Sequence, residues 1–377
     1  MTGWQRIFYA LLAPAAALVA AIAISALVLG LSGHNPISAY GDMLEYARRD
    51  ESIVSIVNRA IPLYIAALAV ALGFKMNLFN IGVEGQYRLA ALFAAWLGAE
   101  VSLPAPLHVS FLLLVAVVVG AVWAGIAAVL RTWRGVSEVI STIMLNSIAV
   151  GVAAYLFRTY FKAPQREGSL LESTEPLPAS ARLPGFDLPF GDARTQVWGF
   201  LFIAIALGIG YYVLIWRTRF GFDLRASGAN ASAARASGVN PARMILFTLL
   251  LSGAVAGLVG MPQLLGSTFK YDNAFQAGIG FTGIGVALLG RNNPAGMAVG
   301  ALLFSFLDRS SQILDLQDIP REVVAIMQGT ILLSAVVAYE VVRRMADRAE
   351  VKAAASRLAE TRSGPGGLSP AGAGGTA

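Results

Sequence analysis

The sequence has no cysteine, only two histidines and only four lysines among its 377 residues. Without cysteine, neither disulfides nor thiolate metal sites can form. With His34 and His108 as the only imidazoles, a His/Cys metal cluster or a Cys-His nucleophile cannot be assembled. None of the lysines follows a glycine, so the chain has no G-x-x-x-x-G-K-[ST] phosphate-binding loop. The sequence therefore supports neither an enzyme nor a cofactor held by this chain.

Charged residues are also scarce, at 13% of the chain against 56% hydrophobic residues, and the mean hydropathy is +0.66. Soluble domains carry about 25% charged residues, so the composition predicts a protein that crosses the lipid bilayer several times. The net charge of +6 does not indicate a nucleic-acid partner. Most basic residues lie in short segments that flank apolar runs, where they set the orientation of a membrane protein.

The apolar runs predict an all-α integral membrane protein with about ten transmembrane helices. A helix needs about 20 apolar residues to cross the hydrocarbon core. No clear A-x-A cleavage site follows the first run, which we interpret as a retained signal-anchor helix. The predicted spans are residues 7–31, 60–75, 85–102, 107–130, 138–161, 197–216, 243–265, 275–290, 295–308 and 321–342.

Three basic groups predict the orientation. Arg131 and Arg134 follow the fourth span, five arginines lie in residues 217–243, and a third group follows the last span. The positive-inside rule places all three groups in the cytoplasm, and ten spans then leave both termini there. The long segments 33–59 and 163–195 fall outside, and the apolar residues of the first have the helical spacing of a segment that can lie on the membrane surface.

One polar stretch, GFKMNLFNIGVEGQYR at residues 73–88, interrupts this apolar region, and two interpretations are open. Glu84 and Arg88 have the i, i+4 spacing of a helix-surface pair, and Glu84 fits the positive end of the next helix. The stretch can therefore be a cytoplasmic loop before a well-capped helix. Alternatively, it lies within the bilayer, where its backbone must face protein or a water-filled path, as in the broken helices of transporters.

A second stretch favours the broken-helix interpretation. FKYDNAFQAG at residues 269–278 echoes FKMNLFNIG at residues 74–82, since both contain Phe-Lys, Asn-x-Phe, an amide residue and a glycine. The first copy follows a span running inward and the second a span running outward, as in inverted-topology repeats. We predict such repeats at residues 60–161 and 243–342.

These repeats place the predicted substrate path at the two polar stretches, together with an asparagine in the middle of the fifth span. A mid-span asparagine more often hydrogen-bonds a neighbouring helix, so its contact with substrate is the less favoured of two readings. The predicted substrate-path residues are Asn77, Phe79, Asn80, Glu84, Gln86, Asn146, Asn273, Phe275 and Gln276. The whole membrane domain is predicted at residues 1–352, followed by a disordered cytoplasmic tail at 353–377 that is rich in glycine and proline.

The basic connection at residues 217–243 is predicted to contain short capped helices. Asn230 can cap the Ala-rich segment that follows it, Gly238 can close that segment, and Pro241 can start the next span. A loop that only fixes topology would not require such structure. We therefore favour a docking element for another protein.

Four motifs resemble a known family: FNIGVEGQ, GFDLRASGANASAARASGVN, LSGAVAGLVG and GIGFTGIGVALLGRNNPAG. They are similar to permease subunits of ABC importers of the simple sugar and nucleoside branch, within the ribose and branched-chain amino acid permease group. The resemblance covers residues 60–345. The first motif and the long outer segments resemble most the larger of two paralogous permeases in nucleoside-type systems.

The resemblance implies an importer in the bacterial cytoplasmic membrane with a second permease subunit, separate ATPase subunits that hold ATP and Mg, and an extracytoplasmic substrate-binding lipoprotein. It places Asn80, Glu84 and Gln86 at the translocation pathway. It also implies that residues 222–238 form the coupling helix that enters a groove on the ATPase. The predicted coupling residues are Asp223, Arg225, Gly228, Asn230, Arg235 and Gly238.

Two alternative functions differ from this class. An ion-coupled secondary transporter of a small polar solute would need buried carboxylates or histidine relays, and only Glu84 and Glu138 lie near polar breaks. A channel or a non-transporting membrane scaffold is the other alternative. The sequence does not distinguish a nucleoside from a pentose or a flavin-like ring as the solute, and the resemblance favours a heterodimer of permeases over a homodimer.

Overall fold

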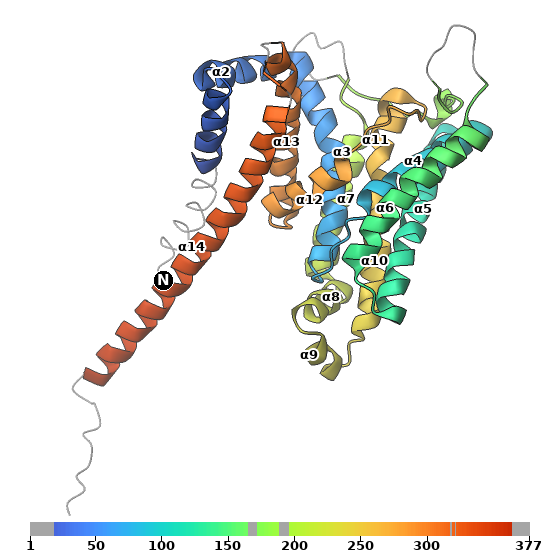
Figure 1. Ribbon diagram of the computed structural model, residues 1–377. Coiled ribbons are helices and arrows are strands. Elements are labelled where there is room, and N and C mark those ends of the chain that lie inside the picture. Colours follow the sequence, from blue (N-terminus) through green and yellow to red (C-terminus); the bar gives the residue numbers. More distant parts are fainter. Residues whose placement is uncertain (1–18, 165–171, 188–195, 317–318, 321, 364–377) are drawn as a thin grey trace, which may run out of the picture. The chain divides into compact units, whose positions relative to one another are not determined.

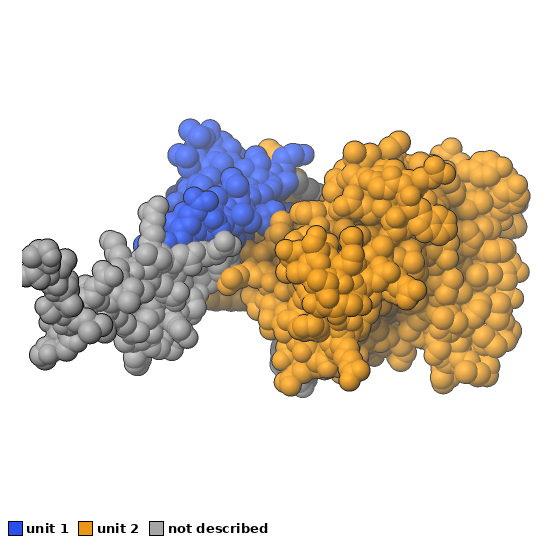
Figure 2. All heavy atoms as spheres, turned by 90° about the horizontal axis from the view of Figure 1, so that it is seen from below, with its two compact units in different colours: residues 1–37, 322–377 blue, residues 38–321 orange. Residues whose placement is uncertain are grey.

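The computed structural model describes residues 19–164, 172–187, 196–316, 319–320 and 322–363. The chain divides into two compact units, one of residues 38–321 and one of residues 1–37 with 322–377 (Figure 2). In the described ranges all regular elements are helical, apart from two isolated β-bridges. The predicted all-α class is confirmed.

The order of helices follows the predicted order of apolar runs (Figure 1). From residue 36 onward the main helices are α2 (Pro36–Ala47), α3 (Asp50–Phe74), α4 (Val83–Glu100), α5 (Ala105–Arg134), α6 (Glu138–Leu156), α7 (Phe200–Arg217), α8 (Arg219–Ala229), α9 (Ala231–Ala236), α10 (Pro241–Gly257), α11 (Met261–Gln263), α12 (Ile279–Leu289), α13 (Pro294–Asp315) and α14 (Glu322–Ser363). A π-helical turn, Phe157–Phe161, extends α6, and a second one, Leu264–Thr268, extends α11.

Five of these helical segments are long and apolar enough to cross a membrane. They are Asp50–Phe74, Ala105–Arg134, Glu138–Phe161, Phe200–Arg217 and Pro241–Thr268. The 11-residue α12 is shorter than a crossing, and α4 carries Glu84, Arg88 and Glu100. The described residues therefore support a multi-pass membrane protein, while the number ten stays a prediction.

Two predicted boundaries are wrong. The span expected at residues 60–75 already begins at Asp50, because Asp50 and Glu51 in the first turn complement the helix dipole. The expected surface segment 33–59 consequently divides between α2 and the first turns of α3. In the smaller unit, helix Val19–Leu31 occupies the described part of the expected N-terminal helix 7–31.

The other end of the smaller unit also differs from the prediction. Helix α14 continues to Ser363, past residue 353, where the sequence predicts a disordered tail. The remainder of that predicted tail lies outside the described residues.

Helix α3 forms the centre of the larger unit. Its residues 65–72 are each exposed by 2% or less, so this part of the helix is enclosed on all sides. The outer helices instead expose large apolar side chains, such as Val118 and Val122 of α5. This arrangement fits a bilayer, where lipid tails are as apolar as the side chains that face them.

Helices α5 and α10 approach each other through glycines. A Cβ atom on Gly253 would lie 2.5 Å from the carbonyl oxygen of Gly120, and one on Gly257 would lie 2.0 Å from that of Ala116. Small residues permit this close backbone approach, which is a main source of helix association in membranes.

The described parts of the outer segment 163–195 attach to the end of the α10 span. The backbone amides of Thr174 and Leu177 donate hydrogen bonds of 2.9 and 2.7 Å to the carbonyls of Tyr271 and Phe269. Leu183 binds the Leu265 carbonyl in the same way at 2.9 Å. An extended, proline-rich segment without helix partners of its own satisfies its backbone by pairing with another irregular stretch.

Helix α9 and the start of α10 are capped as the sequence predicts. The Asn230 side chain accepts hydrogen bonds of 3.0 Å from the backbone amides of Ser232 and Ala233. Gly238, at φ +86°, closes α9, and the Asn240 side chain accepts from Arg243 at the start of α10. Both short helices lie at the lower end of α10 in Figure 1.

Candidate functional site

The polar stretch after α3 forms a tight break between two helices. Asn77 has a positive φ of 55°, and the chain then turns back so closely that a Cβ atom on Gly73 would lie 2.8 Å from the Leu78 carbonyl oxygen. Regular helix resumes at Val83. A left-handed residue ends an α-helix, and asparagine adopts that conformation more readily than most side chains.

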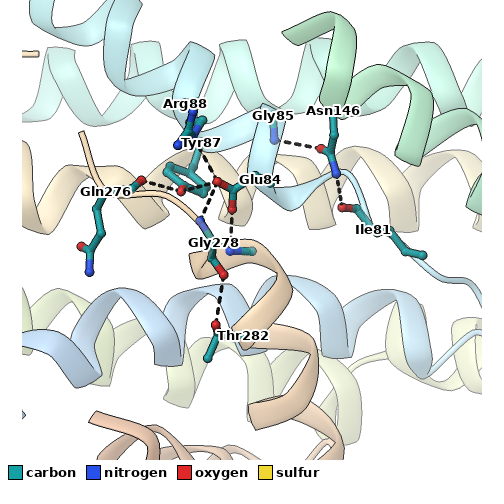
Figure 3. Close-up of polar contacts among 10 residues, drawn as sticks. Ile81, Glu84, Gly85, Tyr87, Arg88, Asn146, Gln276, Gly278 and Thr282 are labelled. Atoms are coloured by element: carbon teal, nitrogen blue, oxygen red, sulfur yellow. Dashed lines mark hydrogen bonds and ion pairs between the residues drawn. The ribbon is translucent and has the colours of Figure 1, made fainter. Parts of the chain in front are cut away.

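Glu84 clamps this break to the second polar stretch (Figure 3). Its Oε1 atom accepts a hydrogen bond of 2.8 Å from the amide of Gly278, and Oε2 accepts one of 3.0 Å from the amide of Gly280. These amides belong to the start of α12, where backbone N–H groups have no partner within the helix and favour an anion. A carboxylate in the first turn of α4 thereby caps α12.

Two neighbours of Glu84 complete the clamp. The hydroxyl of Tyr87 donates to Glu84 at 2.9 Å and also lies 2.7 Å from the backbone carbonyl of Gln276. Arg88 Nε lies 3.1 Å from Glu84 Oε1 and forms an ion pair with it. Since Glu84 is only 6% exposed, the arginine and the three hydrogen-bond donors offset the cost of burying its charge.

Asn80 and Gln86 form a second buried polar group inside the break. Their side-chain amides bind each other reciprocally, with both hydrogen bonds 3.0 Å long. Asn80 also donates to the Ser252 hydroxyl of α10 at 2.8 Å and accepts from the Gly82 amide at 3.0 Å. Both amides are 1% exposed and are saturated by protein partners.

Helix α6 holds the other side of the break through Asn146. Its side chain accepts from the Gly85 amide at 2.9 Å and donates to the Ile81 carbonyl at 2.7 Å (Figure 3). Gly85 permits this approach, because a Cβ atom there would lie 2.6 Å from that of Ala149. Asn146 thus binds a neighbouring segment, as mid-span asparagines commonly do.

These contacts decide where the predicted path residues lie. The structure brings Glu84, Asn80, Gln86 and Asn146 together, but in the protein interior with their polar groups directed at backbone and at one another. Phe275 is also buried and stacks on Tyr271, with ring centroids 4.8 Å apart. The remaining path residues are Asn77, Phe79 and Asn273, which are exposed, and Gln276, which is half-buried.

Asn77 contacts α8 rather than the other path residues. Its Nδ2 donates a hydrogen bond of 2.7 Å to the carbonyl of Gly228. A Cβ atom on Gly228 would lie 2.6 Å from Met76 Cα, so the backbones of α8 and the break are in direct contact. Nearby, the Lys75 ammonium lies 4.7 Å from the centroid of the Trp216 ring, in a cation–π contact.

The predicted coupling residues of the α8–α9 segment differ in their exposure. Asn230, Arg235 and Gly238 are exposed, whereas Asp223 and Arg225 are half-buried. Arg225 Nε donates to the Gly221 carbonyl of its own helix at 3.2 Å. The exposed residues lie at the protein surface, and Gly228 faces the break.

A polar cavity of about 890 Å³ lies at the other end of α3. Its wall includes Asn58, Arg59, Trp198, Gln263, Gln276 and Arg309. Of the predicted path residues, Gln276 alone lines it among the described residues. The other wall residues lie at span ends, where polar residues are ordinary, so the sequence pattern does not single them out. Asn58 and Arg59 directly before an apolar run, and Asp308-Arg309 at the end of another, are the signal that could have found them.

The described residues contain no group of three or more histidine, aspartate or glutamate side chains that could hold a metal ion. The arrangement comprises a helical membrane bundle, a clamp between two broken helices, capped helices at one end and a polar cavity at the other. It defines a multi-pass helical membrane protein with buried polar groups at two helix breaks.

Comparison with known proteins identifies the family. Residues 52–336 match the family described as "Branched-chain amino acid transport system / permease component", and the chain belongs to this family. The glucose ABC transporter permease protein TsgB13 of Haloferax volcanii is 35% identical over 329 residues, covering 85% of each chain.

Two further relatives have bacterial sources. The guanosine ABC transporter permease protein NupP of Bacillus subtilis is 34% identical over 88% of this chain and 94% of its own. The nucleoside ABC transporter permease protein NupB of Lactococcus lactis is 30% identical over 85% of this chain and 89% of its own. These relatives are transport subunits, and none is named as an enzyme.

Proposed function

We propose that this chain is the permease subunit of an ATP-driven ABC importer that carries nucleosides or related simple sugars across the bacterial cytoplasmic membrane. The family membership supports the permease class. The relatives named for guanosine, nucleosides and glucose support the solute class.

The contact between Asn77 and Gly228 is the observation that carries the coupling role. A conformational change of a separate ATPase subunit, which holds ATP and Mg, would displace helices α8 and α9. The 2.7 Å hydrogen bond from Asn77 to Gly228 and the backbone contact at Met76 would transmit this displacement to the break between α3 and α4. From there the Glu84 clamp reaches α12. Such a chain of packed groups is the physical form that coupling between distant sites takes.

Other subunits belong to the proposal. A second, paralogous permease is supported by relatives that occur as pairs within one organism, such as NupP with NupQ and NupB with NupC. An extracytoplasmic binding lipoprotein would deliver the solute. The arginines at the α8–α9 end favour the cytoplasm for that end and for both termini. The clamp between the two echoed stretches is compatible with the inverted repeats at 60–161 and 243–342.

The two carboxylates that could serve an ion-coupled secondary transporter are both paired with arginines. Glu84 is paired with Arg88, and Glu138 Oε2 lies 3.2 Å from Arg131 Nε. Carboxylates that are paired with arginine are poor carriers for a proton or a cation, because binding would break an existing ion pair.

The test is uptake by the purified complex in proteoliposomes. The chain is co-expressed with candidate ATPase, second-permease and binding-lipoprotein subunits from the same organism, and uptake of labelled guanosine and of labelled glucose is measured with and without internal ATP. Uptake that needs both ATP and the ATPase is expected. Equal uptake driven by a proton or sodium gradient without the ATPase would overturn the proposal.

A further inference from the structure

The polar cavity has the size and position of a solute site. Its volume of about 890 Å³ falls within the range of roughly 300–1,000 Å³ that is typical of small-molecule pockets. It is lined by the first turns of α3, whose last residue adjoins the contact with α8. Arg59 and Phe74, the last residue of α3, are separated by fifteen positions, which corresponds to about 23 Å along a helix at 1.5 Å per residue, and Asn77 lies three positions further on. The cavity and the coupling contact therefore lie at opposite ends of one helix.

The wall of the cavity is chemically mixed. It presents the indole of Trp198, the carboxamides of Gln263 and Gln276, and two residues of each charge, namely Glu51, Asp187, Arg59 and Arg309. Arg59 is also ion-paired with Asp308. A wall with balanced charges gives a neutral solute no disadvantage, and carboxamides can both donate to and accept from hydroxyl groups.

Two polar atoms of this wall have no hydrogen-bond partner among the described residues. They are the buried atoms Gln263 Oε1 and Arg309 Nε. Buried polar atoms are normally paired, and an exception calls for a ligand, a water or a change of side-chain rotamer. A hydroxyl-bearing solute could bind both atoms if the side chains of Gln263 and Arg309 each rotate into the cavity.

Trp198 supplies a flat apolar surface among these polar groups. One side of its ring is packed over Gly266, where a Cβ atom would lie 3.0 to 3.3 Å from ring and Cβ atoms of the tryptophan. Its backbone amide is fixed by Asn58 Oδ1 at 2.8 Å. An indole that is anchored in this way can stack on a sugar or base face at little cost in side-chain entropy.

Gln276 connects the cavity with the clamp. Its side chain points away from Glu84 (Figure 3), while its backbone carbonyl lies 2.7 Å from the Tyr87 hydroxyl. A displacement of Gln276 on solute binding would therefore act on Tyr87, whose hydroxyl also binds Glu84.

We infer that this cavity is the solute-binding site of the permease and that it takes a neutral, hydroxyl-bearing solute, either a sugar or the sugar part of a nucleoside. The inference rests on the proposed transport function. The residues that touch the solute are then Trp198, Gln263, Gln276 and Arg309, and the buried clamp residues do not touch it.

Transport by substituted complexes provides the first test. Trp198→Ala and Gln276→Ala remove side chains but keep the backbone bonds to Asn58 and Tyr87. At saturating loaded binding protein, we expect each to lower uptake per ATP hydrolysed by about tenfold, which corresponds to the loss of one good contact. Trp198→Phe keeps a stacking surface and should restore most uptake. The matched control is Trp133→Ala, a tryptophan that is 79% exposed.

Thiol labelling provides a second test that does not need transport. The natural chain has no cysteine, so Ser267→Cys at the cavity and the exposed Ser38→Cys of α2 each introduce a single thiol. Millimolar guanosine or glucose is added to the purified complex before a small maleimide. We expect slower labelling of Ser267→Cys and unchanged labelling of Ser38→Cys. The solute that slows labelling more, guanosine or glucose, shows whether the site prefers a nucleoside or a free sugar.

The outcomes separate the site from the function. If the wild-type complex shows ATP-dependent uptake but neither solute protects Ser267→Cys, the cavity is not the site and the proposed function stands. Unchanged uptake by both Trp198→Ala and Gln276→Ala would overturn the inference in the same way. Absence of ATP-dependent uptake by the wild-type complex would instead overturn the proposed function.

Discussion

The carboxylate of Glu84 accepts a hydrogen bond of 2.8 Å from the backbone amide of Gly278, which lies 194 positions later in the chain. This contact joins the start of α4 to the start of α12. Gly278 has a φ of +84°, a conformation that side-chain-bearing residues rarely adopt, and it turns the chain into α12. The two polar stretches that resemble each other in sequence are therefore neighbours in space.

The first prediction concerns the charge of Glu84. Glu84→Ala should destabilise the protein by about 3–5 kcal/mol, because Arg88 and the α12 amides would be left buried without their partner. Glu84→Gln keeps an acceptor and should cost less, about 1–3 kcal/mol. Thermal unfolding of the purified complex in detergent measures both changes.

Glu340→Gln is the control for Glu84, since Glu340 forms a more exposed i, i+4 pair with Arg344 on α14. Exposed pairs contribute about 0–1 kcal/mol, so this change should hardly move the unfolding temperature. Equal effects of Glu84→Gln and Glu340→Gln would contradict the clamp.

The second prediction concerns the link between Asn77 and α8. Asn77→Asp keeps the shape of the side chain and the tolerance for positive φ. It replaces a donor with an acceptor facing the Gly228 carbonyl. We expect the ATPase to remain bound, while the amount of solute moved per ATP falls severalfold, because loss of one charge-opposed hydrogen bond costs about 1–3 kcal/mol.

Asn35→Asp is the matched control for Asn77→Asp. The Asn35 side chain accepts a hydrogen bond from the Ile37 amide, and an aspartate can still accept it. Both variants are compared for uptake and for ATP hydrolysis in the same proteoliposomes. A normal ratio of uptake to hydrolysis in Asn77→Asp would remove this residue from the coupling path.

The third prediction concerns the surface between α8 and the break. Gly228→Ala would place a Cβ atom 2.6 Å from Met76 Cα, so α8 must shift away from the break. Overpacking of this kind costs about 1–3 kcal/mol, and we expect weaker association with the ATPase in pull-down experiments. Gly210→Ala on α7, whose new Cβ meets no atom within 4 Å, is the control.

The fourth prediction concerns the close contact of α5 and α10. A Cβ atom on Gly253 would lie 2.3 Å from that of Ala124, so Gly253→Ala should separate the helices and destabilise the fold by about 1–3 kcal/mol. Gly151→Ala on α6, which has open space at the Cβ position, should leave the unfolding temperature unchanged. Similar melting of the two variants would show that the contact contributes little.

The sequence predicted the polar stretches of the site better than their role. It placed a break at residues 73–88 and an echo at 269–278, and both interrupt helices in the structure. It could not show that Asn80 and Gln86 bind each other, because either amide could equally face a solute. It also missed Trp198, Gln263 and Arg309, which come together only when the segment before α7, the α10 span and α13 are packed.

The sequence by itself determined that the chain is helical, crosses the membrane several times and has capped helices in its basic connection. Hydrophobic run length, charge placement and capping residues act over a few neighbouring residues, so a linear pattern records them. Only the tertiary structure decided that Glu84 caps a helix 194 positions away. It also decided that Asn77 joins α8 and that the polar cavity lies at the far end of α3. A buried polar side chain takes whichever partner the packed helices bring to it, and the sequence pattern does not specify that partner.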